Sequence, residues 1–294
     1  MRFENTMTWH KAFDASIFDM FKGGSFELLD LSHPFGRGNP LWPSNGDFHI
    51  DRVQHMPMHY RLLQTFNSFH MHNSTHADSP SHVIPESPYT HELPLENYLG
   101  EAVCLDIPKG KWELITVEDI ENAAKKVEGG IKEGDWVLLN TGTHRRWGEN
   151  DDYFGYSPGL SIEGANWFVE HHVKGVGFDM QAIDHILYTY AADHGPGPYV
   201  PRIVEEYEKE FGHPAKDDFP EWEPCHDILL RNNVMGIENL GGDLDKVTNQ
   251  RFLFCAFPLR WYMGDGTIVR AVAIVPSDRI NRDIPDREYP YGVF

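Results

Sequence analysis

The sequence predicts an α/β protein in which some strands pair directly and others are separated by helices. Seven short apolar runs recur along the chain, and several end in Gly or Pro, as strands do. Three stretches between them show amphipathic helical spacing with recognisable caps. The 294 residues are 40% hydrophobic and 13% aromatic, which is enough to fill a core and excludes disorder for most of the chain.

The predicted strands share a short length, a high content of apolar residues and a nearby turn residue. In chain order they are Phe26–Leu31, Ala102–Ile107, Trp136–Asn140, Gly175–Phe178, Val234–Ile237, Arg251–Phe257 and Ile268–Val275.

Each predicted helix has its own start signal. The first begins at Thr116, where Thr-Val-Glu-Asp fits a capping box, and it ends at Gly129–Gly130. The second covers Ser161–Val173, with the serine as its cap. The third covers Pro201–Phe211, with the proline at its first position and a charged outer face.

Two regions are predicted as additions to a single domain of residues 25–294. The first is an N-terminal extension of residues 1–24, and the second is an inserted segment at about 187–224, rich in Pro, Tyr, Asp and Glu. Long stretches of this kind are often lids or interface elements. Seven aromatic residues in the second region indicate that it packs on something, such as another subunit: Tyr188, Tyr190, Tyr199, Tyr207, Phe211, Phe219 and Trp222.

Charge and cysteine content limit the partners and the compartment. With 25 Lys and Arg against 45 Asp and Glu, the net charge is −20, which argues against binding to nucleic acid. Cys104, Cys225 and Cys255 are too few and too scattered for a disulfide framework, as expected in a reducing compartment. Without a secretory signal or an apolar stretch of membrane-spanning length, we expect a cytoplasmic protein with no membrane partner.

The 17 histidines are partly ordered into a motif. His72, His76, Asp78 and His82 form the pattern H-x3-H-x-D-x3-H. A lone histidine is more often a core residue than a ligand, but four such groups in so short a segment indicate a metal site.

The spacing of the motif suits a catalytic metal. His72 and His76 fall on one side of a helical turn or of a tight bend, and Asp78 supplies an oxygen. Pro80 cannot continue a helix, so the chain turns there and brings His82 back toward the site. Two imidazoles and one carboxylate leave coordination positions open, and the lack of thiolates favours Zn²⁺ or Mn²⁺. The residue after the first histidine is Asn, which excludes the metalloprotease helix motif.

Four further residues have open interpretations on their own. His226 reads as a helix-end residue and Glu238 as a strand-end surface carboxylate. Asp179 and Asp184 follow a predicted strand, where they either support a site or are solvated at the surface.

Several motifs together resemble one known family. They are Leu29–Pro34, Pro40–Pro43, His72-Asn-Ser-Thr-His-Ala-Asp-Ser-Pro-Ser-His82, Val137–Gly142, Pro158–Ser161, Val176–Asp179, Pro258–Arg260 and Gly264–Gly266. With them, the stretch from Leu28 to Val275 resembles the metal-dependent cyclase-type hydrolases, which include bacterial kynurenine formamidase and isatin hydrolase.

The resemblance implies a swivelling β/β/α fold, a homodimer or homotetramer, and one or two divalent ions, Zn²⁺ or Mn²⁺, per subunit. His72, His76 and Asp78 match ligands of a first metal. His226 and Glu238 match ligands that complete a second position, with Asp78 and Glu238 able to bridge.

The family pattern also assigns residues outside the ligand set. His82 matches the catalytic acid/base, and Trp42 matches an aromatic wall of the substrate pocket. Ser74 departs from the pattern, because it replaces the usual Gly and crowds the turn. The segment between His82 and His226 is longer than in compact members, so the identity of the substrate does not follow from the resemblance.

Together these features predict a hydrolase that uses a metal-activated water to cleave an amide C–N bond. Trp42, Phe66 and Phe69 suit a small aromatic or cyclic substrate, such as a lactam or an N-formyl arylamine, although they equally suit a core. One alternative is a lactone or ester hydrolase on the same site. Another is a metal-binding protein without turnover, which His82 disfavours because it exceeds the number of ligands needed.

Overall fold

The structure is a computed structural model that describes residues 25–285, except 37, 38, 44, 47, 55–57, 59–62, 191 and 194–196 and the side chains at 52 and 66. The predicted N-terminal extension, residues 1–24, lies outside the described residues. Its separation from one domain of residues 25–294 stays a prediction.

A mixed sheet of nine strands organises the described chain. Across the sheet, the strands are β1 (Phe26–Asp30), β13 (Val272–Pro276), β11 (Arg251–Cys255), β5 (Leu99–Asp106), β7 (Trp136–Asn140), β9 (Gly175–Phe178), β10 (Met235–Glu238), β4 (His76–Asp78) and β12 (Gly266–Ile268). The central strands β5, β7, β9 and β10 run parallel, and the pairs on both flanks are antiparallel. The predicted α/β class is confirmed, as are the first six predicted strands, with small shifts at their ends.

The seventh predicted strand, Ile268–Val275, is wrong as a single element. Its first part ends β12, which pairs with β4, and its second part is most of β13, which pairs with β1 and β11. The break falls at Arg270, whose guanidinium pairs with Asp30. An apolar run identifies extended chain but not its neighbours, so it could not reveal two strands with different partners.

The short connection between β12 and β13 shows that the sheet curls on itself. β12 is at one edge of the strand order and β13 lies next to the other edge, which in a flat sheet would place them roughly 33 Å apart. Residues 269–271 can bridge at most about 15 Å. The two edges must therefore approach each other, and the connection is hydrogen-bonded to both. Val269 N–H donates to Thr75 O, next to β4, at 3.0 Å, and Leu31 N–H, next to β1, donates to Ala271 O at 2.8 Å.

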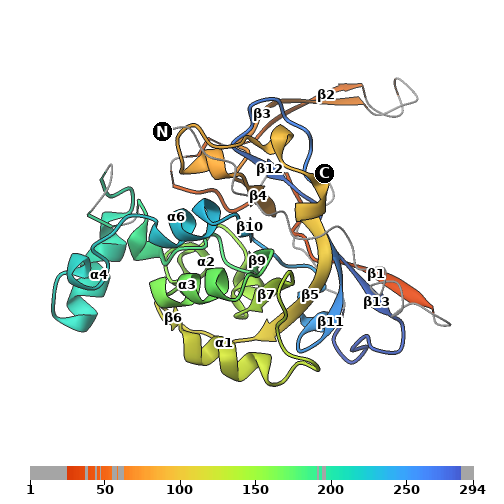
Figure 1. Cartoon of the computed structure of the whole chain (residues 1–294). Coiled ribbons are helices and arrows are strands. Elements are labelled where there is room, and N and C mark those ends of the chain that lie inside the picture. The colour runs from red at the N-terminus through yellow and green to blue at the C-terminus, as the bar shows by residue number, and fades with distance from the viewer. Residues whose placement is uncertain are drawn as a thin grey trace.

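The two faces of the sheet support two hydrophobic cores. On one face, Val103 and Leu105 of β5 pack with helices α1 (Val117–Ala124), α3 (Ile162–Glu170) and α6 (Pro224–Arg231), which Figure 1 shows on one side of the central strands. On the other face, Ala102 and Cys104 pack with residues of β1, β11 and β13 inside the curled sheet. The alternation of side chains along β5 separates these cores.

The helix starts follow the predicted capping chemistry. Thr116 caps α1 in a reciprocal capping box with Asp119, and Ser161 Oγ accepts the Gly164 N–H at 3.0 Å at the start of α3. α4 (Pro201–Phe211) starts with its proline and ends at Gly212, whose φ is +78°. All three predicted starts are confirmed.

The described part of the 187–224 segment packs on the chain's own surface. It contains α4 and α5 (Ala215–Asp218), at the periphery of the molecule in Figure 1. A third hydrophobic cluster joins it to the body, and in it the rings of Trp112 and Tyr207 lie 5.2 Å apart and those of Tyr188 and Phe219 lie 4.9 Å apart. Many of its aromatic side chains therefore have partners within the same chain.

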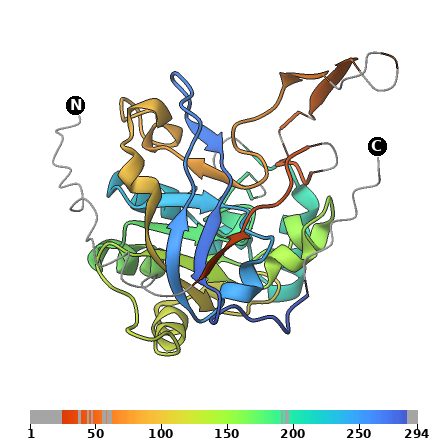
Figure 2. The same ribbon diagram turned by 90° about the vertical axis from the view of Figure 1, so that its right-hand side faces the viewer.

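Two small sheets and one short helix complete the fold. They are the hairpin β2 (His49–Gln54) with β3 (Leu63–Ser68), the pair β6 (Leu114–Ile115) with β8 (Gly159–Leu160), and helix α2 (Asp151–Phe154). Figure 1 and Figure 2 both show the β2–β3 hairpin projecting from the body. Within the described ranges, no helix is long and apolar enough to cross a membrane.

Candidate metal centre

The register of three strands builds the centre of the site. Residues two apart in a strand point to the same face, so β4 presents His76 and Asp78 side by side. The antiparallel pairing with β10 places Glu238 directly opposite His76. On the other side of β4, the pairing with β12 places Gly266 opposite Asp78. Because glycine has no side chain, this position leaves room for the His72 ring, which a Cβ would overlap.

His72 reaches the same place through a bend, which was one of the two predicted arrangements. Residues 72–75 bend, and the strand begins at His76. Ser74 at the bend has a φ of +55°, a left-handed conformation that glycine adopts without strain. Its hydroxyl donates to the carbonyls of His33 and Pro34 at 3.3 Å, which holds the serine in place.

Four buried side chains place nitrogen or oxygen atoms that can coordinate a metal close to one another. His76 Nε2 lies 3.3 Å from Glu238 Oε2 and 3.5 Å from Asp78 Oδ1. His226 Nε2 lies 3.1 Å from Glu238 Oε1 and 3.7 Å from Asp78 Oδ2. Two imidazole nitrogens and two carboxylates therefore converge between β4, β10 and α6.

The outer nitrogens of both imidazoles have their own partners. His76 Nδ1 lies 2.8 Å from Ser74 O, which makes that nitrogen the donor and directs Nε2 toward the two carboxylates. His226 Nδ1 lies 2.6 Å from Asp184 Oδ2. Asp184 also accepts the backbone N–H groups of Cys225 and His226, so it fixes both the first turn of α6 and the ring. A carboxylate behind an imidazole is a common support for a metal ligand.

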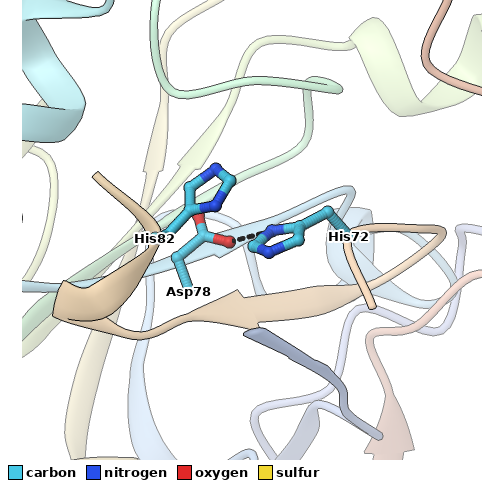
Figure 3. A group of neighbouring side chains, drawn as sticks. All are labelled: His72, Asp78 and His82. Atoms are coloured by element: carbon cyan, nitrogen blue, oxygen red, sulfur yellow. Dashed lines mark hydrogen bonds and ion pairs between the residues drawn. The ribbon is translucent and has the colours of Figure 1, made fainter. Parts of the chain in front are cut away.

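A second group of side chains shares Asp78. Figure 3 shows His72 and His82 beside Asp78, with His72 Nδ1 2.7 Å from Asp78 Oδ1. The two imidazole rings stack with centroids 3.8 Å apart. Asp265, just before β12, lies 3.0 Å from His72 Nε2 and 3.5 Å from His82 Nδ1. Asp78 is therefore common to two groups of possible ligands.

These residues fit a divalent cation. Asp78 Oδ2 is buried without a hydrogen-bond partner, which is costly for a carboxylate oxygen unless a cation binds it. Among the described residues, no Lys or Arg pairs with Asp78, Glu238 or Asp265. The donor set of imidazole and carboxylate, without thiolate, suits Zn²⁺ or Mn²⁺.

The pKa values follow the same electrostatics. Burial opposes charge on His72, but hydrogen bonds to Asp265 and Asp78 outweigh it and raise its pKa to about 10. Burial opposes charge on Asp78 too, but the neighbouring histidines hold its pKa well below the usual range. His82 differs, because burial lowers its pKa and favours the neutral ring. The carboxylates thus attract a cation, either a proton or a metal ion.

A cavity of about 490 Å³ opens beside these groups. His82, Glu238 and Trp42 line it, so the aromatic residue expected at the pocket wall is in the cavity lining. Polar residues also line it, and among them the Tyr153 hydroxyl donates to the side chain of Asn239. Part of the wall comes from the 187–224 segment, through Tyr190, Trp222 and Glu223.

The structure brings together all six residues of the expected metal and acid/base set: His72, His76, Asp78, His82, His226 and Glu238. Phe69 instead packs against the rings of Phe35, Phe48 and Trp261, and none of these four residues is in the cavity lining. Phe66 lies in β3, and its side chain is outside the described residues.

Sequence reasoning missed one carboxylate at the site, Asp265, and left the role of another, Asp184, open. Asp184 is buried against His226, whereas the sequence left its position open. Asp265 lies in the Gly264–Gly266 motif, which carried the family resemblance without an assigned role. Asp179 is also buried, but it bonds His144 and Thr141 rather than the candidate ligands. Only the Gly264–Gly266 motif offered a signal for Asp265.

Comparisons with known proteins identify a family and several relatives of this chain. A family model described as "Putative cyclase" matches residues 29–185. Isatin hydrolase from Roseibium aggregatum is 26% identical over 275 residues, covering 86% of this chain and 94% of that protein. Kynurenine formamidase from Erythrobacter litoralis is 22% identical over 261 residues, covering 88% of this chain and 95% of that protein.

A solved structure shows the same fold. Isatin hydrolase A from Ralstonia solanacearum superposes with a TM-score of 0.67 at 22% identity, covering 85% of this chain and 92% of that one. The chain therefore belongs to the cyclase family. Within that family it is related to isatin hydrolase and kynurenine formamidase, and the fold expected from the resemblance is confirmed.

Proposed function

We propose that the protein is a metal-dependent hydrolase that cleaves an amide C–N bond of a small aromatic or cyclic substrate, either a lactam or an N-formyl arylamine. The observation that carries the proposal is that imidazole nitrogens and carboxylate oxygens gather around Asp78. His82 lies beside them and lines the cavity. The relatives' names, isatin hydrolase and kynurenine formamidase, support an amide or lactam bond.

His72, His76 and Asp78 would hold a first ion, and His226 and Glu238 would complete a second position that shares Asp78. The geometry groups the possible ligands differently, as His72, Asp78 and His82 in one set and His76, Asp78 and Glu238 in the other. The two sets share Asp78, which is in keeping with one or two ions. When bound, Zn²⁺ or Mn²⁺ supplies Lewis-acid chemistry, which acidifies water and polarises a carbonyl.

His82 is proposed as the acid/base. Its Nδ1 faces Asp265, so Nε2 is the nitrogen available to the cavity. A neutral imidazole takes a proton from the attacking water and later delivers it to the departing nitrogen. Amide cleavage needs this delivery, because an unprotonated amine anion is a poor leaving group. An ester or lactone needs it far less, and so comparison of these substrates tests the role of His82.

Two further parts of the proposal concern the protein's assembly and location. We expect a homodimer or homotetramer, as the family resemblance implies, and light scattering of the purified protein checks it. A cytoplasmic location is expected from the scattered cysteines, and cell fractionation checks that expectation.

The proposal is tested by stripping the protein with a chelator, restoring Zn²⁺ or Mn²⁺ separately, and assaying N-formylkynurenine, isatin and an aromatic lactone side by side. Metal-dependent ring opening or deformylation supports an amidohydrolase. Turnover of the lactone alone would point instead to an ester or lactone hydrolase. Tight metal binding without turnover of any of the three would contradict the proposed substrate class.

A further inference from the structure

One wall of the cavity is aromatic and acidic, and it comes from the two ends of the 187–224 segment. The rings of Tyr190 and Trp222 lie edge to face, with centroids 5.3 Å apart and an interplanar angle of 71°. Glu223 follows directly and lines the same cavity. Its backbone N–H donates to Tyr188 O at 2.8 Å, which ties this wall to the buried part of the segment.

The backbone at Glu223 is held in an unusual conformation. Its φ of +49° and ψ of 47° are left-handed, which is costly for a residue with a side chain and more so before a proline. Strained positions of this kind tend to occur at functional sites, where the surrounding structure maintains them. Here the conformation occurs at a residue of the cavity lining, at the start of α6.

Among the described residues, this wall has no Lys or Arg as a counter-ion, and the positive group that acts on Glu223 is the imidazole of His226. Asp227 also lines the cavity, but Arg231 neutralises it through a hydrogen bond of 3.0 Å between Nε and Oδ2. No Lys or Arg in the described part of the chain lines the cavity or pairs with Glu223. A substrate carboxylate would meet repulsion here, whereas a cation would meet compensation.

We propose that this cavity selects substrates whose ring carries a positive charge, with Glu223 as the counter-ion and Tyr190 and Trp222 as aromatic faces for the cationic group. Aromatic rings beside a carboxylate form a binding site for ammonium groups, since both attract positive charge. The inference rests on the proposed function for the bond that is cleaved, and it adds the chemical class of the substrate.

The test uses two isosteric ketones, which offer a carbonyl but no C–N bond to cleave. They are 4-acetylphenyltrimethylammonium and its uncharged counterpart 4-tert-butylacetophenone. Calorimetry with the zinc-loaded full chain at pH 8 is expected to give a dissociation constant at least tenfold lower for the cation. Equal affinity for the two ketones, or tighter binding of the neutral one, would overturn the inference.

Matched variants separate a local effect from the net charge of the protein. E223Q should remove most of the preference for the cation and leave binding of the neutral ketone within twofold. E221Q loses the same charge two residues away, at an exposed position outside the cavity lining, and should keep the preference. An equal loss in both variants would contradict a role for Glu223.

If E223Q does not fold, Y190L measured in the same way should reduce the preference for the cation at least threefold. An unchanged preference would overturn the proposal.

The corresponding formanilides, 4-(trimethylammonio)formanilide and 4-tert-butylformanilide, report turnover separately. Hydrolysis of both at equal kcat/KM, with equal ketone affinities, would contradict the charge preference but keep the amidohydrolase. No hydrolysis of either, with tighter binding of the cationic ketone, would contradict the formamide chemistry but keep the charge preference.

Discussion

Glu238 on β10 lies directly opposite His76 on β4, and Glu238 Oε2 is 3.3 Å from His76 Nε2. These residues are far apart in the sequence, and the antiparallel register alone brings them together. A slip of one residue would turn every side chain of β4 to the opposite face. The positions of the candidate ligands are therefore set by backbone hydrogen bonds of a buried sheet, which are more rigid than those of a loop.

His82 and His72 should respond differently to truncation. We expect H82A to lower kcat by roughly 10²–10⁴ while retaining zinc, because the proposed proton transfer is lost but the five proposed ligands remain. H72A should lose zinc and activity together. Metal analysis and turnover of the same preparations check both expectations, and near-full activity of H82A would assign the proton transfer to another group.

Asp184 should control metal affinity through His226. In D184N, the hydrogen bond to His226 Nδ1 loses its anionic acceptor, and we expect zinc affinity to fall by about 10–100-fold. Competition with a chromophoric chelator measures this change. D227N is the control, because Asp227 lies on the same helix but pairs with Arg231. Equal zinc affinities of D184N and the parent protein would show that Asp184 stabilises only the first turn of α6 and does not support His226 as a ligand.

His144 should make stability depend on pH. Burial opposes charge on His144, but Asp179 and Asp245 outweigh it and raise its pKa above 6.5. The protonated ring therefore contributes stability fully below pH 6.5, and this contribution is lost as pH rises through the higher pKa of the folded state. We expect H144Q to cost about 3 kcal/mol at pH 6 and less at pH 9.

Urea unfolding of the zinc-loaded proteins across this range checks the expectation for His144. H171Q at an exposed position is the control and should cost little at either pH. A cost of H144Q that does not change with pH would mean that His144 stays neutral in the folded protein.

Gly159 should tolerate no side chain. A Cβ there would overlap the backbone N and Cα of His185, and backbone cannot move aside as a flexible side chain can. We expect G159A to lower the free energy of unfolding by about 2–3 kcal/mol. G36A is the matched control, since a Cβ at Gly36 would meet no described atom within 4 Å. Similar unfolding midpoints for the two variants would contradict the packing at Gly159.

Local signals allowed much of the fold to be predicted. Helix starts depend on one or two adjacent side chains, so Thr116 and Ser161 revealed them. The curl of the sheet depends on which strands pair, and nothing within Ile268–Val275 indicates that β12 joins β4 while β13 joins β1. Strand partners are a property of the whole chain, which explains this error.

The same distinction applies to the site. His72, His76, Asp78 and His82 lie within one short segment, so their spacing alone indicated a metal site. His226 and Glu238 could be placed only through the family resemblance, because each is ordinary in its local context. The sequence left the role of Asp184 open and gave Asp265 none, since the importance of both comes from contacts across the chain. Phe69 lies close to the histidine motif in the sequence, but its ring packs in a separate aromatic cluster, so closeness in sequence did not predict its contacts.

The position of β4 between β10 and β12 also sets an order of events during synthesis. A ribosome releases the histidine motif early, but the strands that flank it emerge only after most of the chain has been made. Until then the imidazoles and Asp78 lack the neighbours that orient them, and the nascent segment is held by few local contacts. An ion held by these residues would therefore be loaded late in folding, once the last strands close the curled sheet.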